Sequence, residues 1–202
     1  MSDGLSVDPR VARTRHDVLA AARSVLLYEG WERVTLARVA ERSGYARTTL
    51  YRHWPQRLDL LRDLIREEGR LTHTSRTGDL RADLVAELEA FRAALTTTGF
   101  GRAFVAIGQQ AGVDPEFADL TREIRADGGR VLHAIVVDGV QSGELASDLR
   151  PDAAIPQLVG PVLFRYLFEA DDVLDSEFVR SVVDWFLAAA REGETGAGAA
   201  SD

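Results

Sequence analysis

Hydrophobic residues recur every three to four positions along nearly the whole chain, which is the period of an amphipathic helix. No segment shows the sustained alternation of polar and apolar residues that marks a half-buried strand. The first helix is predicted to begin at Asp8-Pro9, where an N-cap carboxylate precedes proline at the first helical position, and to end at Gly30. Its apolar face carries Val18, Ala22, Val25 and Leu26.

Three shorter helices follow the first one. Thr35 is the predicted N-cap of the second helix, and Gly44 ends it, because glycine adopts the left-handed conformation that closes a helix. The third helix covers residues 46–54. The fourth begins near Pro55 and fades in the polar, turn-rich segment 72–78, which is a candidate domain boundary.

The C-terminal part of the chain is predicted to add five helices. Asp79 caps the first of them, and Asp114-Pro115 opens another with the cap-then-proline signature. One alternative stays open, because the apolar run 134–137 is also compatible with a strand, although no partner strand is visible. The predicted ranges are 79–95, 100–111, 114–141, 152–169 and 176–191.

The predicted fold class is therefore all-α, with about nine helices. We expect an N-terminal three-helix domain over residues 1–55, and a connecting helix and loop over 56–78. A second helical domain over 79–191 follows. The tail 192–202 contains too few apolar side chains to fold and is expected to be disordered.

The third helix carries the most unusual stretch of the chain, "ARTTLYRHW" from Ala46 to Trp54. On a helical projection, Ala46, Leu50 and Trp54 fall on one side and are expected to pack inward. The other side carries hydrogen-bonding groups of the kinds that read base edges or hold phosphates. These are Arg47, Thr48, Thr49, Tyr51 and Arg52, with His53 at the edge.

The residues before this stretch have the spacing of a helix-turn-helix. Ala40 is followed after three residues by Gly44, and after five more by Leu50. A small residue lets the two helices approach closely, glycine accepts the positive φ of the tight turn, and leucine anchors the second helix. The second helix is then free to enter a major groove about 12 Å wide.

The charge of the chain is unevenly distributed. The net charge is −8, but residues 1–60 hold 10 arginines against 7 acidic residues. A mildly basic N-terminal end on an acidic body directs a polyanion to one end only. The charge pattern thus favours the same end for nucleic acid as the helix-turn-helix does.

The segment "VTLARVAERSGYARTTLYRHWPQRLDLL" (Val34–Leu61) resembles the DNA-binding domain of the tetracycline-repressor-like (TetR) family of bacterial transcription regulators. The resemblance is specific from about residue 13 to residue 61. Beyond residue 78 it rests on the helix layout and on "GPVLFRYLF" (Gly160–Phe168), which is similar to the penultimate helix of one TetR subgroup. It implies a homodimeric, ligand-responsive regulator of a palindromic operator on double-stranded DNA, most often a repressor.

The resemblance also implies roles for single residues. Arg47 and Thr48, with Tyr45 or Arg52, would read bases, whereas Ala37 stands where some members carry a base-contacting arginine. Alternatives remain open for several positions, since Tyr51 can pack against the fourth helix and His53 can be a core residue. Arg10, Arg13 and Arg15 form either a phosphate-binding arm or solvated surface. The predicted phosphate contacts are Thr35, Tyr51, His53 and Arg57.

The last two helices are too apolar for the surface of a monomer. A helix that is apolar all round is buried all round, so we expect two helices from each chain to form a four-helix bundle in a symmetric dimer. An interface of this kind buries on the order of 2,000 Å². The predicted interface residues are Leu163, Phe164, Leu167, Val182, Trp185 and Phe186.

A ligand pocket between the body helices is the weakest signal. Aromatic residues at helical spacing more often belong to the ordinary core, and polar residues more often lie at the surface. Both alternatives to a pocket therefore stay open at these positions. By resemblance, a small apolar or amphipathic effector in this region would shift the dimer to a state that does not bind DNA. The candidate lining residues are Phe91, Phe104, Ile107, Gln110, Leu132, Val136 and Tyr166.

Several classes of function find no support in the sequence. The chain contains no cysteine, and the four histidines, His16, His53, His73 and His133, lack metal-binding spacing, so no metal or cofactor is expected. No nucleophile motif or glycine-rich phosphate loop indicates an enzyme. No apolar run approaches the roughly 18 residues of a membrane span, and no signal sequence is evident, which favours the cytoplasm. An enzyme or a protein-contact module on a helical scaffold is the alternative.

Overall fold

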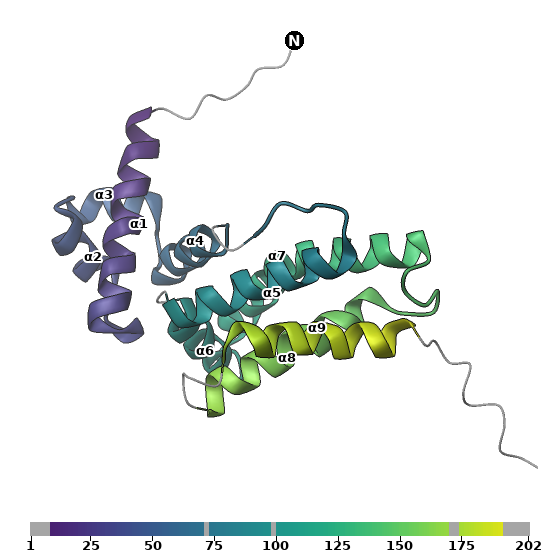
Figure 1. Ribbon diagram of the computed structural model, residues 1–202. Helices are drawn as coiled ribbons and strands as arrows, with labels where there is room; N and C mark the ends of the chain where they lie inside the picture. Colours follow the sequence, from purple (N-terminus) through teal and green to yellow (C-terminus); the bar gives the residue numbers. More distant parts are fainter. Residues whose placement is uncertain (1–8, 71–72, 98–99, 170–173, 192–202) are drawn as a thin grey trace, which may run out of the picture. The chain divides into compact units, whose positions relative to one another are not determined.

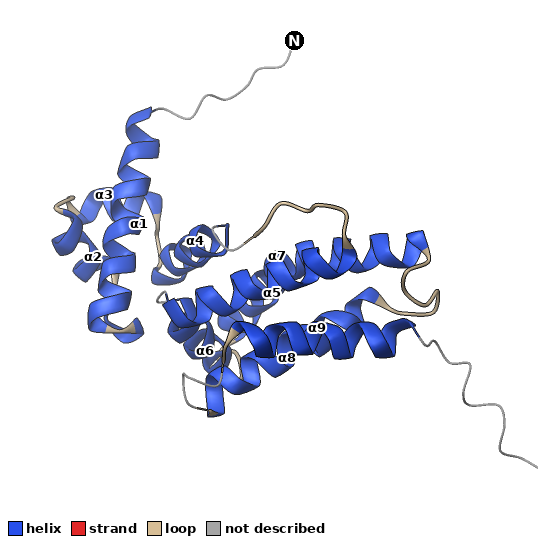
Figure 2. Cartoon of the chain, viewed as in Figure 1, coloured by secondary structure: helices blue, strands red, loops and turns tan. Residues whose placement is uncertain are grey.

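The computed structural model describes residues 9–70, 73–97, 100–169 and 174–191 (Figure 1). Within these ranges every regular element is helical (Figure 2): nine α-helices and the short 3-10 helix η1 (Trp31–Arg33). The predicted all-α fold is confirmed. The strand alternative for residues 134–137 is wrong, because these residues lie inside a continuous α-helix. None of the described helices combines the length and apolar character needed to cross a membrane.

The chain forms two compact units, each assembled from two stretches of sequence. The described residues up to 68 and from 100 to 124 belong to the first unit, and those from 69 to 97 and from 125 to 191 belong to the second. This division describes packing, so the predicted functional boundaries at residues 55, 78 and 191 stay predictions. The predicted disorder of the tail 192–202 concerns residues outside the described ranges.

The first unit is built around the N-terminal helices. Helix α1 ends before Gly30, whose φ of 92° lies in the region that glycine tolerates. The helix begins at Pro9 as predicted, while the expected cap Asp8 lies outside the described residues. The unit comprises α1 (Pro9–Glu29), η1, α2 (Leu36–Ser43), α3 (Arg47–His53), α4 (Arg57–Arg70) except its last two residues, α6 (Phe100–Gln110) and the start of α7 (Pro115–Ser142).

Buried apolar side chains from α1, α2 and α3 form a shared core in this unit. Val25, Leu26 and Leu50 are fully buried, and Val39 lies with them at the same level of burial. Removing side chains of this kind typically costs 2–5 kcal/mol, roughly, because a cavity remains. The core therefore fixes α3 from its inner side.

The second unit consists of α5 (Leu80–Thr97), the remainder of α7, α8 (Pro151–Phe168) and α9 (Ser176–Arg191). Helix α5 begins where predicted, because the Asp79 carboxylate accepts a hydrogen bond from the backbone N of Ala82 at 2.7 Å. It lies against α8 and α9 (Figure 1). An ion pair between Arg81 and Asp184, at 2.7 Å, joins α5 to α9 on the solvent side.

Candidate nucleic-acid interface

The turn between α2 and α3 has the geometry that the spacing predicts. The Thr35 hydroxyl accepts a hydrogen bond from the backbone N of Arg38 at 3.2 Å, which caps α2. Gly44 ends the helix with φ 76° in the left-handed region, and its N–H donates to the Ala40 carbonyl at 3.0 Å. A residue with a Cβ disfavours this conformation, so glycine makes the tight turn possible.

Helix α3 buries one side and exposes the other. Leu50 and Trp54 are 0% and 1% exposed, so the inner side packs as predicted. The prediction that Ala46 packs inward is wrong: Ala46 is exposed and has extended φ and ψ of −61° and 141°. It is the N-cap and precedes the first helical turn, so a helical projection does not apply to it.

The outer side of α3 presents the predicted DNA-binding residues to solvent. Arg47, Thr48 and Arg52 are exposed, and Tyr51 is 51% exposed, whereas Thr49 and His53 are half-buried. Within the described chain, no ion pair or hydrogen bond engages the side chain of Arg47 or of Arg52.

Several arginines elsewhere in the same unit are paired with carboxylates. Arg38 contacts Glu29 at 2.7 Å, and Arg62 contacts Glu123 at 3.0 Å. Their cations are therefore partly neutralised by neighbours. The free cations of α3, by contrast, remain available for a partner outside the chain.

Three predicted site residues already make contacts inside the unit. Thr35 is the cap described above, and the Tyr45 hydroxyl donates to Oδ2 of Asp17 at 2.9 Å. Arg57 donates from Nε to the Val34 carbonyl at 2.8 Å and from Nη2 to the Trp31 carbonyl at 3.0 Å. A DNA contact by Arg57 would therefore use its remaining N–H groups, and these three contacts stay predictions.

The environment of Arg57 also affects its titration. Burial lowers the pKa of the Arg57 guanidinium, and the nearby Glu32 carboxylate partly opposes that effect. An arginine remains protonated in proteins, so the group keeps its positive charge. It thus holds a cation next to the start of α4, where backbone N–H groups also favour anions.

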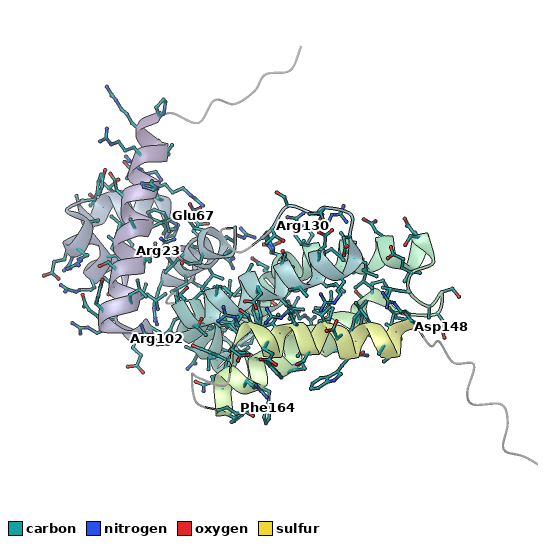
Figure 3. The ribbon with its side chains drawn as sticks, in the orientation of Figure 1. Arg23, Glu67, Arg102, Arg130, Asp148 and Phe164 are labelled. Carbon is teal, nitrogen blue, oxygen red and sulfur yellow. The ribbon has the colours of Figure 1, made fainter. Side chains whose placement is uncertain are left out.

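The predicted dimer-interface residues separate into an exposed group and a buried group, with Leu163 half-buried between the two. Phe164, Leu167 and Trp185 are 58%, 42% and 67% exposed, and Figure 3 shows Phe164 pointing away from α8. Val182 and Phe186 are buried in the core of their own subunit, which removes them from its free surface. Helical spacing does not distinguish an apolar side that faces the subunit core from one that faces a partner.

Phe168 belongs with the exposed group, although it is not among the predicted interface residues. It is 72% exposed and lies beside Phe164, with ring centroids 5.1 Å apart. Its place one helical turn after Phe164 is the sequence signal that identifies it.

The seven predicted pocket residues are distributed over both compact units. Ile107, Leu132 and Val136 are buried, whereas Gln110 is exposed. Phe104, Ile107 and Gln110 belong to the first unit, and the other four to the second. Their role in binding an effector stays a prediction.

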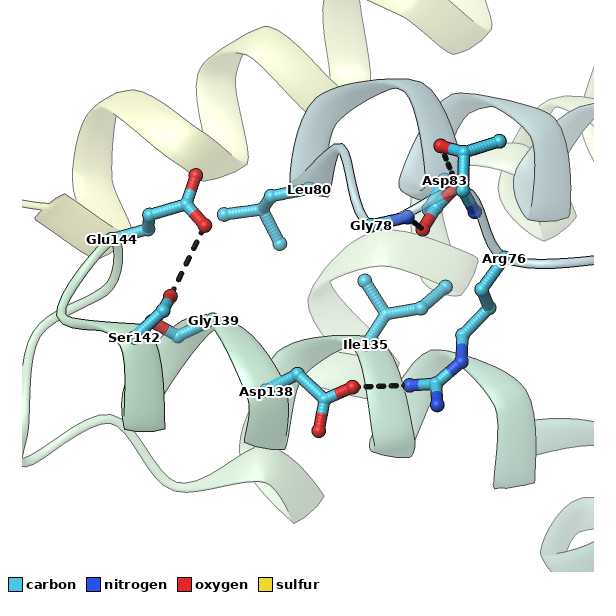
Figure 4. A pocket seen from close by; sticks show the side chains of 10 residues that line it. Arg76, Gly78, Leu80, Asp83, Ile135, Asp138, Gly139, Ser142 and Glu144 are labelled. Carbon is cyan, nitrogen blue, oxygen red and sulfur yellow. Dashed lines mark hydrogen bonds and ion pairs between the residues drawn. The ribbon is translucent and has the colours of Figure 1, made fainter.

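A separate pocket of about 330 Å³ opens in the second unit between the 76–80 segment, α5 and the end of α7 (Figure 4). Arg76 contacts Asp138 at 2.5 Å, and the Ser142 hydroxyl lies 3.1 Å from Glu144. Asp83 accepts from the backbone N and the hydroxyl of Thr77. The polar groups around this pocket are thus paired with one another, and none of the seven predicted residues lines it.

The described residues contain no cluster of three or more histidine, aspartate or glutamate side chains placed to hold a metal ion.

Two carboxylates near α3 were missed by the sequence analysis. Asp17 and Asp63 contact Tyr45 and Trp54, which lie just before and just after α3. An aspartate on an amphipathic helix is typical of solvated surface, so neither position stands out. The available signal was Trp54, because a buried indole N–H usually finds an acceptor.

Comparison with known proteins identifies relatives over both parts of the chain. The family model "Bacterial regulatory proteins, tetR family" matches residues 18–64, and "Tetracyclin repressor-like, C-terminal domain" matches residues 74–186. The chain is 30% identical over 181 residues to the uncharacterized HTH-type transcriptional regulator YdeS of Bacillus subtilis, covering 87% of this chain and 88% of that protein.

Two further relatives extend this comparison. The HTH-type transcriptional repressor BepR of Brucella suis is 28% identical over 166 residues, covering 75% of this chain and 78% of that protein. The crystal structure of the TetR family transcription regulator SCO0332 is 31% identical, with a TM-score of 0.72, covering 87% of this chain and 97% of that one. The similarity thus extends well beyond the helix-turn-helix.

Proposed function

Because the chain belongs to the TetR family of transcriptional regulators, we propose that it binds a palindromic operator as a homodimer and represses transcription until a small molecule releases it. The family consists of DNA-binding regulators that carry a helix-turn-helix, and its members are not enzymes. The operator, the dimer, the repression and the effector are the parts of this function that we propose.

The observation that carries the proposal is the outer side of α3. Arg47 and Arg52 are exposed and engage no partner within the described chain, and Thr48 lies exposed between them. Bidentate contact of arginine with guanine is the commonest specific contact in the major groove. We assign base reading to Arg47 and Thr48, with Arg52 at the edge of the groove.

Phosphate contacts position such a helix without reading sequence. We assign them to Thr35 before α2, to Tyr51 and His53 in the second half of α3, and to Arg57 at the start of α4. Arg57 contributes charge from the start of α4, whereas Tyr51 is half-exposed and offers a hydroxyl.

A homodimer gives this small contact surface its affinity. Two recognition helices held about 34–36 Å apart meet successive major-groove faces of a palindrome. Helices α8 and α9 expose more large apolar side chains to solvent than a soluble monomer usually does. These are Phe164, Leu167, Phe168 and Trp185. We assign them to the contact with a second copy, together with Leu163.

An effector would release the dimer from DNA by changing the distance between the two recognition helices. The apolar residues Phe91, Phe104, Ile107, Leu132, Val136 and Tyr166, with Gln110, are the candidate lining. To shift the two states a hundredfold, a ligand must favour one state by roughly 2.7 kcal/mol. Repression rather than activation is supported by BepR, a transcriptional repressor that is 28% identical to this chain.

The proposal is tested by selecting bound duplexes from a random DNA pool with the full chain. A palindrome with half-sites one helical turn apart is the expected product, and its affinity must fall steeply with salt, since phosphate binding releases counterions. A protein-contact module predicts neither result. Selection that enriches no sequence, with no salt dependence, would reject the proposal.

A further inference from the structure

The recognition helix α3 is too short to hold its own orientation. It contains seven residues, and its N-cap, Ala46, provides no side-chain hydrogen bond. Isolated helices shorter than about 12 residues are marginally stable in water, because the free-energy cost of nucleation exceeds the stabilisation from their few hydrogen bonds. The placement of α3 therefore depends on contacts with other helices, and two of these contacts lie at its two ends.

The N-terminal end of α3 is joined to α1. Tyr45 immediately precedes Ala46, and its hydroxyl donates to Oδ2 of Asp17 at 2.9 Å. Both side chains are half-buried, which limits competition from water. The phenol hydrogen of Tyr45 is thus committed to a carboxylate of the same chain.

The C-terminal end of α3 is joined to α4 and, through it, to α1. Trp54 is the C-cap and is 1% exposed, and its Nε1 donates to Oδ2 of Asp63 at 2.7 Å. The other oxygen of that carboxylate, Oδ1, contacts Nη2 of Arg15 at 2.8 Å. The Asp63 side chain is only 16% exposed, so both of its oxygens are used in a sheltered place.

We propose that Asp17 and Asp63 are positioning residues that hold the two ends of the recognition helix, through Tyr45 and Trp54, in the orientation that reads DNA. Arg15 completes the arrangement by orienting Asp63. The inference rests on the proposed function, because the orientation matters only if α3 reads a duplex. A carboxylate is repelled by the phosphate backbone, so each aspartate acts through its aromatic partner and not by contact with DNA.

In this arrangement Tyr45 positions α3 and does not read a base. The resemblance to known regulators left Tyr45 or Arg52 as a base reader, and the Tyr45 hydroxyl is already used. A base contact through that hydrogen would break the bond to Asp17. Arg52, whose side chain is exposed and has no partner in the described chain, remains as the base reader beside Arg47 and Thr48.

Removing single atoms tests the proposal. Tyr45→Phe deletes one hydroxyl, and Trp54→Phe deletes the indole N–H while keeping an aromatic ring. Each should weaken operator binding by about fivefold, the effect of one ordinary hydrogen bond. The slope of affinity against salt should stay unchanged, whereas loss of one phosphate contact lowers that slope by about 0.9. A changed slope would overturn the assignment.

A matched control is Tyr28→Phe, which makes the same chemical change at a ring that is 82% exposed on α1. Its operator affinity should equal that of the unchanged protein. Because Trp54 is buried, Trp54→Phe can also disturb packing. Asp63→Ala leaves the indole in place and should reproduce the loss, and Asp63→Asn, which keeps an acceptor oxygen, should recover part of it.

A double-mutant cycle separates positioning from base reading at Tyr45. If Tyr45 acts through Asp17, the losses from Asp17→Ala and Tyr45→Phe overlap, and the double variant is no weaker than the worse single one. The loss should also be spread over all operator positions. Additive losses, or a loss confined to one base pair, would show that Tyr45 reads DNA and would overturn the proposal.

Hydrogen exchange without DNA keeps the inference distinct from the proposed function. The backbone amides of Arg47–His53 should exchange about fivefold faster in Tyr45→Phe and Trp54→Phe than in Tyr28→Phe. If the unchanged protein binds no duplex, the proposed function fails, and exchange still decides whether the two ends are held. Equal exchange in all variants would overturn the inference even if operator binding is confirmed.

Discussion

The guanidinium of Arg57 lies 4.5 Å from the ring centroid of Trp31 and donates to the carbonyl of the same residue at 3.0 Å. Phe117, at the start of α7, meets the Trp31 ring edge-on, with centroids 5.9 Å apart. One arginine thus donates to the carbonyls of Trp31 in η1 and of Val34 just after it, stacks on the Trp31 ring, and joins the start of α4 to η1. These contacts lie within the first compact unit.

We expect Arg57→Ala to lower the free energy of unfolding by about 2 kcal/mol, because two charge-assisted hydrogen bonds and a cation–π contact are lost. Arg57→Lys should lie in between, since an ammonium keeps the charge but not the two directed donors. Urea denaturation followed by circular dichroism measures the change. Arg33→Ala, an exposed position of η1 at the same end of α1, is the control and should stay within about 0.5 kcal/mol. Equal stability of both alanine variants would contradict the role of Arg57.

Arg47→Ala should weaken the preference for the operator over unrelated DNA while the dimer stays intact. A bidentate arginine–guanine contact contributes about 1–3 kcal/mol of discrimination, so the preference should fall about tenfold or more. Competition binding with both duplexes measures the ratio. Arg122→Ala, an exposed arginine on α7, should leave it unchanged. Unaltered discrimination in Arg47→Ala would rule out base reading by this residue.

Replacing Trp185 and Leu167 together with serine should produce monomers, because both side chains are exposed on the helices assigned to the dimer. Sedimentation velocity measures the mass. Tyr28→Ser, which changes a more exposed ring on α1, should remain dimeric. A stable dimer of the double variant would place the interface elsewhere.

Phe186 behaves differently from Trp185, although the two are neighbours in sequence. Its side chain is 5% exposed within the subunit, so Phe186→Ser should reduce stability by roughly 3–5 kcal/mol, as expected for a buried aromatic ring. Thermal unfolding measures this loss. A Phe186→Ser subunit of unchanged stability that fails only to dimerise would contradict the burial.

Acid should destabilise the second unit through Asp83. Burial raises the pKa of this carboxyl, but hydrogen bonds from Thr77 and Gly78 outweigh that effect, and the net pKa is lowered. Because the pKa of Asp83 is lower in the folded state than in the unfolded state, the ionised carboxylate stabilises the fold at every pH above the unfolded-state pKa of about 4. This stabilisation is lost as the pH falls from the unfolded-state pKa through the lower folded-state pKa.

Asp83→Asn should therefore be less stable than the unchanged protein at pH 7 and should lose less stability as the pH falls below about 4. Melting temperatures across this range measure both effects. Asp119→Asn, at a more exposed carboxylate on α7, serves as the control and should follow the unchanged protein. Parallel pH profiles for Asp83→Asn and the unchanged protein would contradict the prediction.

Local chemistry explains why much of the fold was predictable. The carboxylate of Asp79, the hydroxyl of Thr35 and the positive φ of Gly44 act within a few residues of their own position, and each starts or ends a helix where expected. The range 176–191 coincides with α9 for the same reason, since Asp175 accepts from the N of Phe178 at 2.8 Å.

The candidate interface was predictable in composition but not in all its contacts. The exposed side of α3 follows from helical periodicity once Leu50 is placed inward. The contacts of Tyr45 with Asp17 and of Trp54 with Asp63 join residues 28 and 9 positions apart. No periodic pattern encodes such pairs, because the sequence does not distinguish a solvated surface aspartate from one that accepts a hydrogen bond from a distant side chain.

The amino-acid sequence by itself determined the helices, their ends, the turn that presents α3, and the membership of the TetR family, because these depend on short-range capping, periodicity and motif spacing. Only the tertiary structure decided which apolar side chains of α9 fill their own core, with Val182 and Phe186 inside and Trp185 outside. It also decided that the side chains of Arg57 and Tyr45 donate hydrogen bonds to other residues of the same chain. The physical reason is that burial and long-range hydrogen bonds depend on which helices pack together, and helical periodicity is the same whichever neighbour covers an apolar side.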